Sequence, residues 1–488
     1  MAISFDSIPN NLRNHGTYIE FNAELAGATS QDFQVVMVGQ RLAAGNKAAG
    51  TVVQVTDPDQ AKAYFGQGSL LANMCGAFLN ANAETPLFCI ALDDDGAAVA
   101  AAGTITVDTA ATKAGTLYVY IGGERVSVGI AADDTVDDIA ANIAAEINAN
   151  SDYPVTAAVN GTTSSQVDVT ARNAGEAMNG LNMRANYYGE KMPDGLTLTF
   201  VDLANGSGNP DLADAIDAMG DTWFNWIINP YTDTANLTTL TDHLNDVWGP
   251  LVQQDRRAFS AFSGTLAECS TFGNALNSPH LTVMGTNKSP TPVYMVAAIN
   301  GAIGSYYLAI DPARPLQTLE LKGMLAPAAE TLWTRSERNV LLYDGIATFK
   351  VMMDGTCQIE RQITTYQRNN NGLTDAAYLD INTPETLSRI RYEQRSMIAA
   401  RYPRHKLADD GTEYGAGQAI VTPSLIKAAL LGLYRELEDR GWVEDFDTYK
   451  ANLIVERNAS DRTRIDWRDT PNLVNQARVF AGKSQFIL

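Results

Sequence analysis

Residues 34–39 read Gln-Val-Val-Met-Val-Gly, an apolar run that is followed by a loop rich in glycine and alanine. A second run, Pro-Leu-Phe-Cys-Ile-Ala-Leu at 86–92, ends in an acidic turn. Short apolar runs bounded by turn residues are typical of buried strands. The same signal returns later in the chain, where helical and strand-like patterns alternate from 206 to 370 and predict an α/β layer. The expected elements there are an apolar run at 222–228, a helix over 237–248 and strands at 281–285 and 348–352.

A compositional island of alanine, threonine, aspartate and valine occupies residues 97–200. Gly122–Gly123 predicts a hairpin turn, because glycine adopts a positive φ without steric cost. Thr135–Asp138 resembles a capping box with aspartate in place of the usual glutamate. The expected elements are strands at 117–121, 126–130, 155–159 and 167–170 and a helix over 136–147. The island therefore predicts an inserted α+β module, since buried-strand patterns precede it and resume after it.

The last quarter of the chain predicts two helices. Thr383 is the expected N-cap of the first, with Pro384 at its first position, and this helix runs to about Tyr402. Thr422 is the expected N-cap of the second, which ends before a glycine at 441. Its apolar stripe consists of Ile426, Leu430, Leu433 and Leu437.

Both ends of the sequence have the alternating pattern of a strand. Residues 17–22 (Thr-Tyr-Ile-Glu-Phe-Asn) alternate apolar and polar side chains, and residues 475–488 do so around Val479 before ending in three large apolar residues. An exposed strand presents unpaired N–H and C=O groups that complete the sheet of another molecule. Two such arms on one multidomain chain indicate a polymerising subunit.

Composition limits the classes of function. The chain has 488 residues, 45% of them hydrophobic, with 56 acidic and 35 basic side chains and a formal net charge of −21. This length suggests about three domains. The negative charge makes a general nucleic-acid binder or a binder of anionic membranes unexpected, because both partners would be repelled. No membrane-spanning run and no secretion signal are expected.

The sequence shows no catalytic constellation. The four cysteines stand alone, which predicts small core residues rather than disulfides or metal ligands. Ala481-Gly482-Lys483-Ser484 lacks the upstream glycine and the following helix of a phosphate-binding loop. No enzyme activity, metal or cofactor is therefore predicted. The basic stretch 389–406 has two interpretations, an anionic docking surface or a helix whose arginines pair within their own fold.

Several motifs resemble contractile phage tail sheath proteins of the Mu-like family. They begin with Met-Ala-Ile-Ser-Phe-Asp-Ser-Ile-Pro at 1–9 and extend along the whole chain, the inserted module included. The other matching segments are 277–280, 310–319, 342–349, 363–366, 402–411, 453–458 and 473–480, with 170–175 and 187–190 in the module.

This resemblance implies a mixed α/β (α+β) multidomain sheath subunit. The expected parts are an N-terminal linking arm (1–22), a core sheath domain (23–96 and 201–370) interrupted by an outer module (97–200), an inner tube-facing domain (371–474) and a C-terminal linking strand (475–488). Such subunits stack as six-fold rings around a tail tube and contract on baseplate triggering to drive the tube through the host envelope. Their partners are copies of themselves, the tube, the baseplate and the tail terminator, in a virion assembled in the host cytoplasm.

The same resemblance assigns residues to assembly. The N-terminal strand consists of Thr17, Tyr18, Ile19, Glu20, Phe21 and Asn22, and the C-terminal strand of Arg478, Val479, Phe480, Ala481, Phe486, Ile487 and Leu488. Lys427, Arg435 and Glu438 are the candidate tube contacts, with 389–406 as the second choice. Two alternatives stay open: a bacteriocin or secretion-type sheath, and a tail-surface receptor-binding protein.

Overall fold

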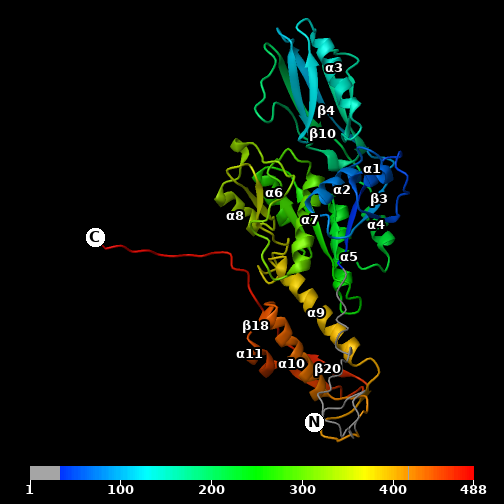
Figure 1. The fold of residues 1–488 in the computed structure, drawn as a ribbon, viewed down its shortest axis with the longest axis vertical. Helices are drawn as coiled ribbons and strands as arrows, with labels where there is room; N and C mark the ends of the chain where they lie inside the picture. The colour runs from blue at the N-terminus through cyan, green and yellow to red at the C-terminus, as the bar shows by residue number, and fades with distance from the viewer. Residues whose placement is uncertain (1–32, 416, 488) are drawn as a thin grey trace, which may run out of the picture. The chain divides into compact units, whose positions relative to one another are not determined.

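The computed structural model describes residues 33–415 and 417–487, so the strand predicted at 17–22 lies outside the described residues. The described chain forms two compact units (Figure 1). The large unit contains residues 33–388 and 473–487, and the small unit contains residues 389–472. Each unit is described by itself below.

A six-stranded sheet organises the large unit, in the order β13-β12-β11-β1-β3-β2. All neighbouring strands are parallel except β2, which runs antiparallel to β3. The strands predicted at 34–39, 86–92 and 281–285 are confirmed, whereas only the end of the 222–228 run is a strand. The bounds are β1 (Val35–Gln40), β2 (Val52–Val55), β3 (Leu87–Leu92), β11 (Trp226–Ile228), β12 (Arg257–Phe262) and β13 (Leu281–Gly285).

Helices cover both faces of this sheet, which explains why its strands are apolar at every position. On β1, Val35 and Met37 join the apolar cluster of α2 (Leu70–Ala81) and α7 (Val293–Ile310). Val36 and Val38 join the opposite cluster, which contains residues of α4 and α5. The remaining elements of this layer are α1 (Pro58–Phe65), α4 (Leu212–Met219), α5 (Thr234–Trp248), α6 (Leu266–Asn274), α8 (Arg335–Tyr343) and the hairpin β14 (Thr348–Val351) and β15 (Cys357–Arg361).

α7 is the central helix of the core. Its length and apolar composition satisfy the criteria for a membrane span, although the sequence was expected to contain none. In the structure 67% of it is buried, where it packs on α2 and on β11 and β12. Gly301 and Gly304 let it approach closely, because a Cβ at these positions would lie 2.7 Å from Ile228 and 2.5 Å from Phe259. Its hydropathy is therefore that of a core helix.

The five elements predicted from the compositional island occur in the expected order, but the module also contains three strands that were not predicted, β4, β9 and β10 (Figure 1). Gly122 and Gly123 both have positive φ in the turn between β5 and β6. The capping box at Thr135 is present, and α3 packs on both of the module's sheets. The sheets are β10-β4-β8-β7 and β6-β5-β9, built from β4 (Ala100–Thr109), β5 (Gly115–Ile121), β6 (Glu124–Ile130), α3 (Val136–Ala149), β7 (Val155–Val159), β8 (Gln166–Ala174), β9 (Met183–Ala185) and β10 (Thr197–Ala204).

Of the two predicted helix caps in the C-terminal quarter, the one at Thr383 is wrong, and the one at Thr422 has the predicted position without a side-chain hydrogen bond. α9 (Asn382–Arg401) begins one residue before Thr383, because the buried Asn382 amide is held by the carbonyl oxygens of Pro312 and Arg314, both at 2.8 Å. α10 (Pro423–Asp439) has Thr422 at the N-cap position, but the Thr422 side chain makes no cap hydrogen bond. The small unit also contains β16 (Lys406–Leu407), β17 (Ile420–Val421), β18 (Val443–Glu444), α11 (Phe446–Asn452), β19 (Ile454–Arg457) and β20 (Ile465–Arg468).

Candidate assembly surfaces

The small unit contains a sheet that stops at two strands. β19 and β20 pair antiparallel, with Val455 opposite Trp467 and Arg457 opposite Ile465. α10 packs against β19, and all four residues of the predicted apolar stripe of α10 are buried. Helix α10 therefore supports a small sheet within this unit.

Both outer edges of this sheet lack a further strand among residues 33–415 and 417–487. A two-stranded sheet is marginally stable in water, and its edges present unpaired N–H and C=O groups. Trp467 is 41% exposed and Ile454 is also exposed. The described part of this sheet therefore ends at two edges with exposed side chains on its strands.

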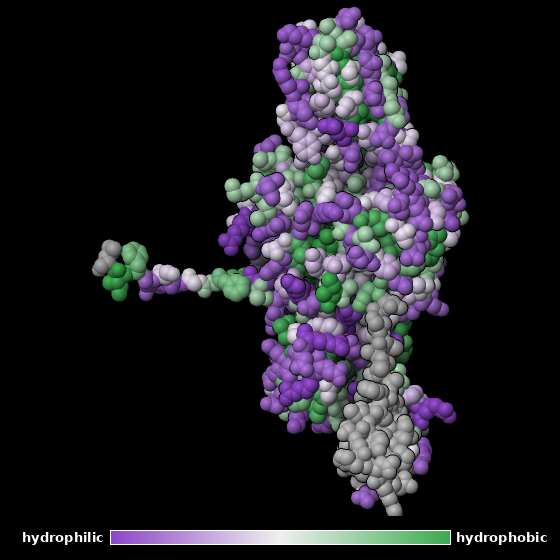
Figure 2. Space-filling view, viewed as in Figure 1, coloured by the Kyte–Doolittle hydropathy of each residue, from purple (hydrophilic) through white to green (hydrophobic). Residues whose placement is uncertain are grey.

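The C-terminal segment has the properties of a strand donor. Residues 474–487 have no helix or strand in the single chain, and they extend as an open trace (Figure 1). The side chains of Phe480 and Ile487 are 89% and 98% exposed. Hydrophobic atoms lie at both ends of this tail with a polar stretch between them (Figure 2). The strand predicted at 475–488 stays a prediction, because a lone segment has no partner with which to form a sheet.

Most of the predicted C-terminal residues share this exposure, but Arg478 does not. Its side chain is 12% exposed and its Nη2 lies 2.8 Å from Asp380 Oδ1. Val479, Phe480, Ala481, Phe486 and Ile487 are exposed, and Leu488 lies outside the described residues.

The three candidate tube contacts have different surroundings. Arg435 and Glu438 form an ion pair at 2.7 Å, and the Arg435 guanidinium lies 3.5 Å from the centre of the Phe446 ring. Glu438 also accepts a hydrogen bond from the backbone N–H of Phe446 at 3.3 Å. These two residues thus tie α10 to α11. Lys427 is half-buried, lies two turns earlier on α10 and forms no ion pair with the described residues.

The basic stretch 389–406 interacts with its own unit. Glu393 pairs with Arg440 at 2.7 Å, and Arg401 lies 3.9 Å from Glu436. The Arg389 guanidinium lies 5.8 Å from the Trp442 ring centre. Arg389 and Arg401 therefore have partners within their own unit, and the choice between the two interpretations of the whole stretch stays a prediction.

Comparison with known proteins identifies the family. Residues 205–365 match the phage tail sheath protein central domain, and residues 374–487 match the phage tail sheath C-terminal domain. The Mu-like prophage FluMu tail sheath protein of Haemophilus influenzae is 42% identical over 491 residues, and the alignment covers all of both chains. The chain belongs to the Mu-like phage tail sheath family.

Solved sheath structures are similar to this sheath protein at low sequence identity. The sheath tail protein from Desulfitobacterium hafniense has a TM-score of 0.48 at 13% identity, covering 94% of this chain and 100% of the other. The helical sheath of the anti-feeding prophage in its contracted state has a TM-score of 0.47 at 9% identity, covering 96% and 98%.

Sequence analysis missed a buried arginine in the sheath protein's core. Arg257 on β12 is fully buried and donates to the Pro384 carbonyl at 2.6 Å and to Ser388 Oγ at 2.7 Å. Its Nε lies 3.8 Å from Glu385 Oε2, and its guanidinium lies 4.7 Å from the centre of the Trp248 ring. The first turn of α9 is thereby fixed to the central sheet of the large unit.

The preceding residue, Arg256, is also buried, and the acceptors around it are neutral. Its guanidinium contacts His243 Nε2 at 2.8 Å and donates to the Thr222 carbonyl at 2.8 Å and to Gln254 Oε1 at 3.0 Å. Burial and the neighbouring Arg256 charge lower the pKa of His243 to about 4. The imidazole is therefore neutral at pH 7 and accepts the guanidinium hydrogen bond through Nε2.

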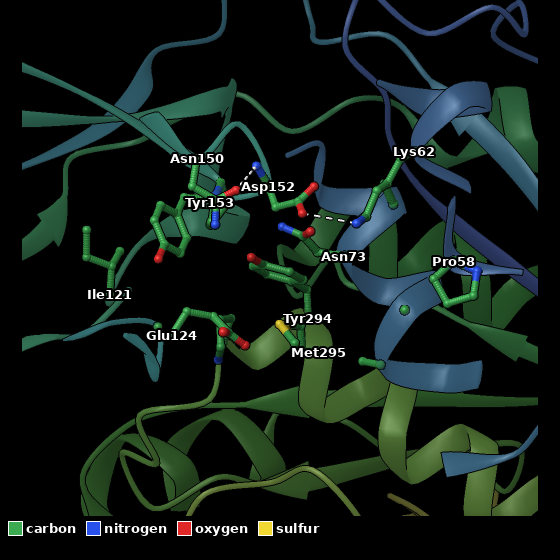
Figure 3. A pocket seen from close by; sticks show the side chains of 16 residues that line it. Pro58, Lys62, Asn73, Ile121, Glu124, Asn150, Asp152, Tyr153, Tyr294 and Met295 are labelled. Carbon is green, nitrogen blue, oxygen red and sulfur yellow. Dashed lines mark hydrogen bonds and ion pairs between the residues drawn. The ribbon is translucent and has the colours of Figure 1, made fainter. Parts of the chain in front are cut away.

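A cavity of about 290 Å³ lies where the module meets α1, α2 and α7 of the sheath protein (Figure 3). Tyr294 and Asn73 reach into it from α7 and α2, and Asp152 lies at its edge in the loop before β7. Lys62 on α1 contacts Asp152 at 3.0 Å, and this hydrogen bond raises the pKa of Lys62. The ion pair fastens the module to the core across the cavity.

The described part of the chain holds no cluster of three or more histidine, cysteine or acidic side chains arranged for a metal ion. The four cysteines are free and buried, as the sequence predicted, and burial raises the pKa of Cys269 and Cys357 to about 12. The thiols of Cys269 and Cys357 are therefore protonated at neutral pH, which suits packing rather than nucleophilic chemistry.

Proposed function

We propose that this chain is the repeating subunit of a contractile tail sheath, which polymerises as stacked six-fold rings around a tail tube. Family membership supports the sheath role, and one structural observation supports the mode of assembly. The small unit carries a sheet whose two outer edges have no further strand among the described residues, while the same chain carries an exposed apolar tail. Strand addition between subunits accounts for both features, because the tail of one subunit pairs with the sheet edge of another and its apolar side chains become buried.

Contraction on baseplate triggering is proposed to follow from the same links. Rigid units joined by strand-paired arms can rearrange as bodies without breaking the chain of contacts. Burial of apolar surface contributes about 25 cal/mol per Å², so a few hundred additional Å² per subunit yields several kcal/mol. This supply of free energy requires no nucleotide or cofactor. The subunit is thus proposed to be a structural component of the virion, and the virion is proposed to be assembled in the host cytoplasm.

The proposed partners, besides copies of this chain, are the tail tube, the baseplate and the tail terminator. Lys427 on α10 is the best of the three candidate tube contacts, because Arg435 and Glu438 already bind each other and α11. The module is proposed to lie on the outer surface of the sheath, where the net charge of −8 carried by residues 96–205 keeps virions apart. A gold label inserted in the exposed loop at 161–164 tests this location, and a label found only at the tube would contradict it.

The decisive experiment is negative-stain electron microscopy of the full chain, alone and with its candidate tube protein. Long hollow tubes are expected, and deletion of residues 479–488 is expected to abolish them. Ile487→Asp is expected to act like the deletion, whereas Leu251→Asp serves as a matched control because Leu251 is 97% exposed at another site.

Two outcomes contradict the proposal. The first concerns the sheath role and the second concerns the role of the C-terminal tail. A chain that stays monomeric with the tube present lacks the polymerising activity, and if it then binds host cells, the receptor-binding alternative applies. Equal loss of tubes in Leu251→Asp and Ile487→Asp shows that any exposed charge disrupts assembly and removes the specific role of the tail.

A further inference from the structure

The C-terminal segment is bound to the large unit before it becomes exposed. Gln476 Nε2 donates to the carbonyl of Ala313 at 3.1 Å. One residue later, Gln317 Nε2 donates to the carbonyl of Ala477, also at 3.1 Å. Two side-chain hydrogen bonds of opposite direction thus hold this short stretch on the loop that follows α7.

Arg478 adds an ion pair to this attachment. Its Nη2 lies 2.8 Å from Asp380 Oδ1, and its other terminal nitrogen lies 3.4 Å from Gln317 Oε1. Asp380 is also held by Arg361, whose Nε and Nη2 each lie 3.0 Å from the carboxylate oxygens. One carboxylate therefore joins two guanidinium groups, a geometry of strong, directional hydrogen bonds.

Exposure changes abruptly after this residue. The Arg478 side chain is 12% exposed, whereas Val479 is 86% exposed. Removal of the Asp380 charge leaves Arg478 and Arg361 as two like charges beside each other, and their repulsion opposes attachment. The Asp380 carboxylate is therefore needed to hold the Arg361 and Arg478 guanidinium groups side by side.

We propose that Arg361, Asp380 and Arg478 form an anchor that sets where the C-terminal arm leaves the subunit, so that the strand offered to a second copy of this chain begins at Val479. This inference rests on the proposed sheath function. Fully extended, residues 479–488 span at most about 36 Å, whereas an arm freed from residue 474 onward spans about 54 Å. The anchor thus restricts both the reach and the starting point of the arm, and its three residues are positioning residues.

Limited trypsin digestion of the full-length monomer, followed by intact mass measurement, tests the anchor directly. Trypsin has two sites in this region, after Arg478 and after the exposed Lys483. In the wild-type protein we expect rapid cleavage after Lys483 and slow cleavage after Arg478. Asp380→Asn is expected to accelerate cleavage after Arg478 at least tenfold and to change cleavage after Lys483 less than twofold.

Three further variants control for misfolding and for charge. Asp380→Glu keeps the carboxylate and is expected to retain most of the protection. Arg478→Lys keeps a trypsin site and leaves the Arg361–Asp380 pair intact, but it loses the forked contacts and is expected to be cleaved faster. Glu320→Gln removes an exposed carboxylate of the same unit and is expected to behave as wild type. Equal cleavage after residue 478 in wild type and Asp380→Asn would falsify the anchor.

Assembly provides the second measurement. Asp380→Asn and Arg478→Lys are expected to raise the protein concentration needed for tube formation about tenfold, with Asp380→Glu and Glu320→Gln near wild type. If a variant releases the arm in the digestion experiment but does not change the protein concentration needed for tube formation, the anchor has no positioning role in assembly. Failure of every chain, wild type included, to polymerise with the tube present contradicts the proposed function instead, while the digestion result still decides whether the anchor exists.

Discussion

The six-stranded sheet of the large unit and the two-stranded sheet of the small unit differ both in composition and in burial, since the first is mainly apolar and half the residues of the second are charged. In the large sheet every residue of β1 is buried, and helices cover both faces. In the small sheet no residue of β19 or β20 is fully buried, and both outer edges lack a strand among the described residues. The two sheets therefore differ in how much of their surface and of their edges is covered by other elements of the described chain.

This comparison separates folding from assembly within one subunit. The large sheet completes its hydrogen bonds and buries its apolar surface internally, so its residues determine the stability of the monomer. The small sheet has no further strand at its outer edges among the described residues, so we propose that its residues contribute to contacts that form in a polymer. Truncations of similar side chains in the two sheets should therefore affect different measurements.

The largest expected effect on stability is in the large sheet. Phe259→Ala on β12 removes a fully buried ring that packs against Gly304. The free energy of unfolding, measured by urea titration, is expected to fall by about 3–5 kcal/mol. Trp467→Ala in the small sheet is the matched truncation and is expected to cost less than about 1 kcal/mol while reducing tube formation. Equal losses of stability in the two variants contradict the comparison.

A smaller effect is expected where a buried charge joins the large sheet to α9. Arg257→Gln removes a buried guanidinium that binds the Pro384 carbonyl and Ser388 and lies 3.8 Å from Glu385, and it is expected to lower the free energy of unfolding by about 3 kcal/mol. Arg435→Gln in the small unit removes an exposed ion pair with Glu438 and is expected to cost less than about 1 kcal/mol. If Arg435→Gln proves as costly, the small unit depends on its polar contacts as strongly as the large one does.

The pH dependence of stability sharpens the comparison further. His243 has a folded pKa of about 4, below the ordinary value near 6.5, so the unfolded chain binds the proton first as the pH falls. Its contribution is fully present above pH 6.5 and is lost between about pH 6.5 and pH 4. His243→Gln lacks this dependence, and the stability difference between wild type and variant is expected to change by about 1–2 kcal/mol between pH 7 and pH 4.5. A constant difference across this range contradicts the buried, neutral histidine.

The smallest effect is expected at the junction of the module with the core. Lys62→Met removes a partly exposed ion pair with Asp152 and is expected to cost about 0.5–1 kcal/mol. Lys113→Met is the matched control, because its pair with Asp194 lies within the module and is more exposed. Hydrogen exchange of the loop at 150–154 is expected to rise only in Lys62→Met, and equal exchange in both variants contradicts a fastening role.

The sequence analysis correctly predicted those elements that are determined by residues close to one another in the chain. The turn at Gly122–Gly123, the capping box at Thr135 and the strands at 34–39 and 86–92 are decided by neighbouring residues, and the structure contains each of them. The capping of α10 was not predictable in this way. There the Asp410 carboxylate, 14 positions earlier in the chain, accepts hydrogen bonds from the Ser424 backbone N–H at 3.1 Å and hydroxyl at 2.5 Å, while Thr422 holds the N-cap position without a side-chain cap hydrogen bond.

The sequence by itself determined the first buried strands, the hairpin turn and capping box of the module, and the family, because these depend on periodicity, turn residues and motifs along the chain. The tertiary structure alone decided which charges are buried and which tail residues are bound. Arg257 contacts a carbonyl 127 positions away and Arg478 binds a carboxylate about one hundred positions away. Periodicity reports only which face of an element is apolar, whereas the burial of a charge depends on a partner that folding brings from a distant part of the chain.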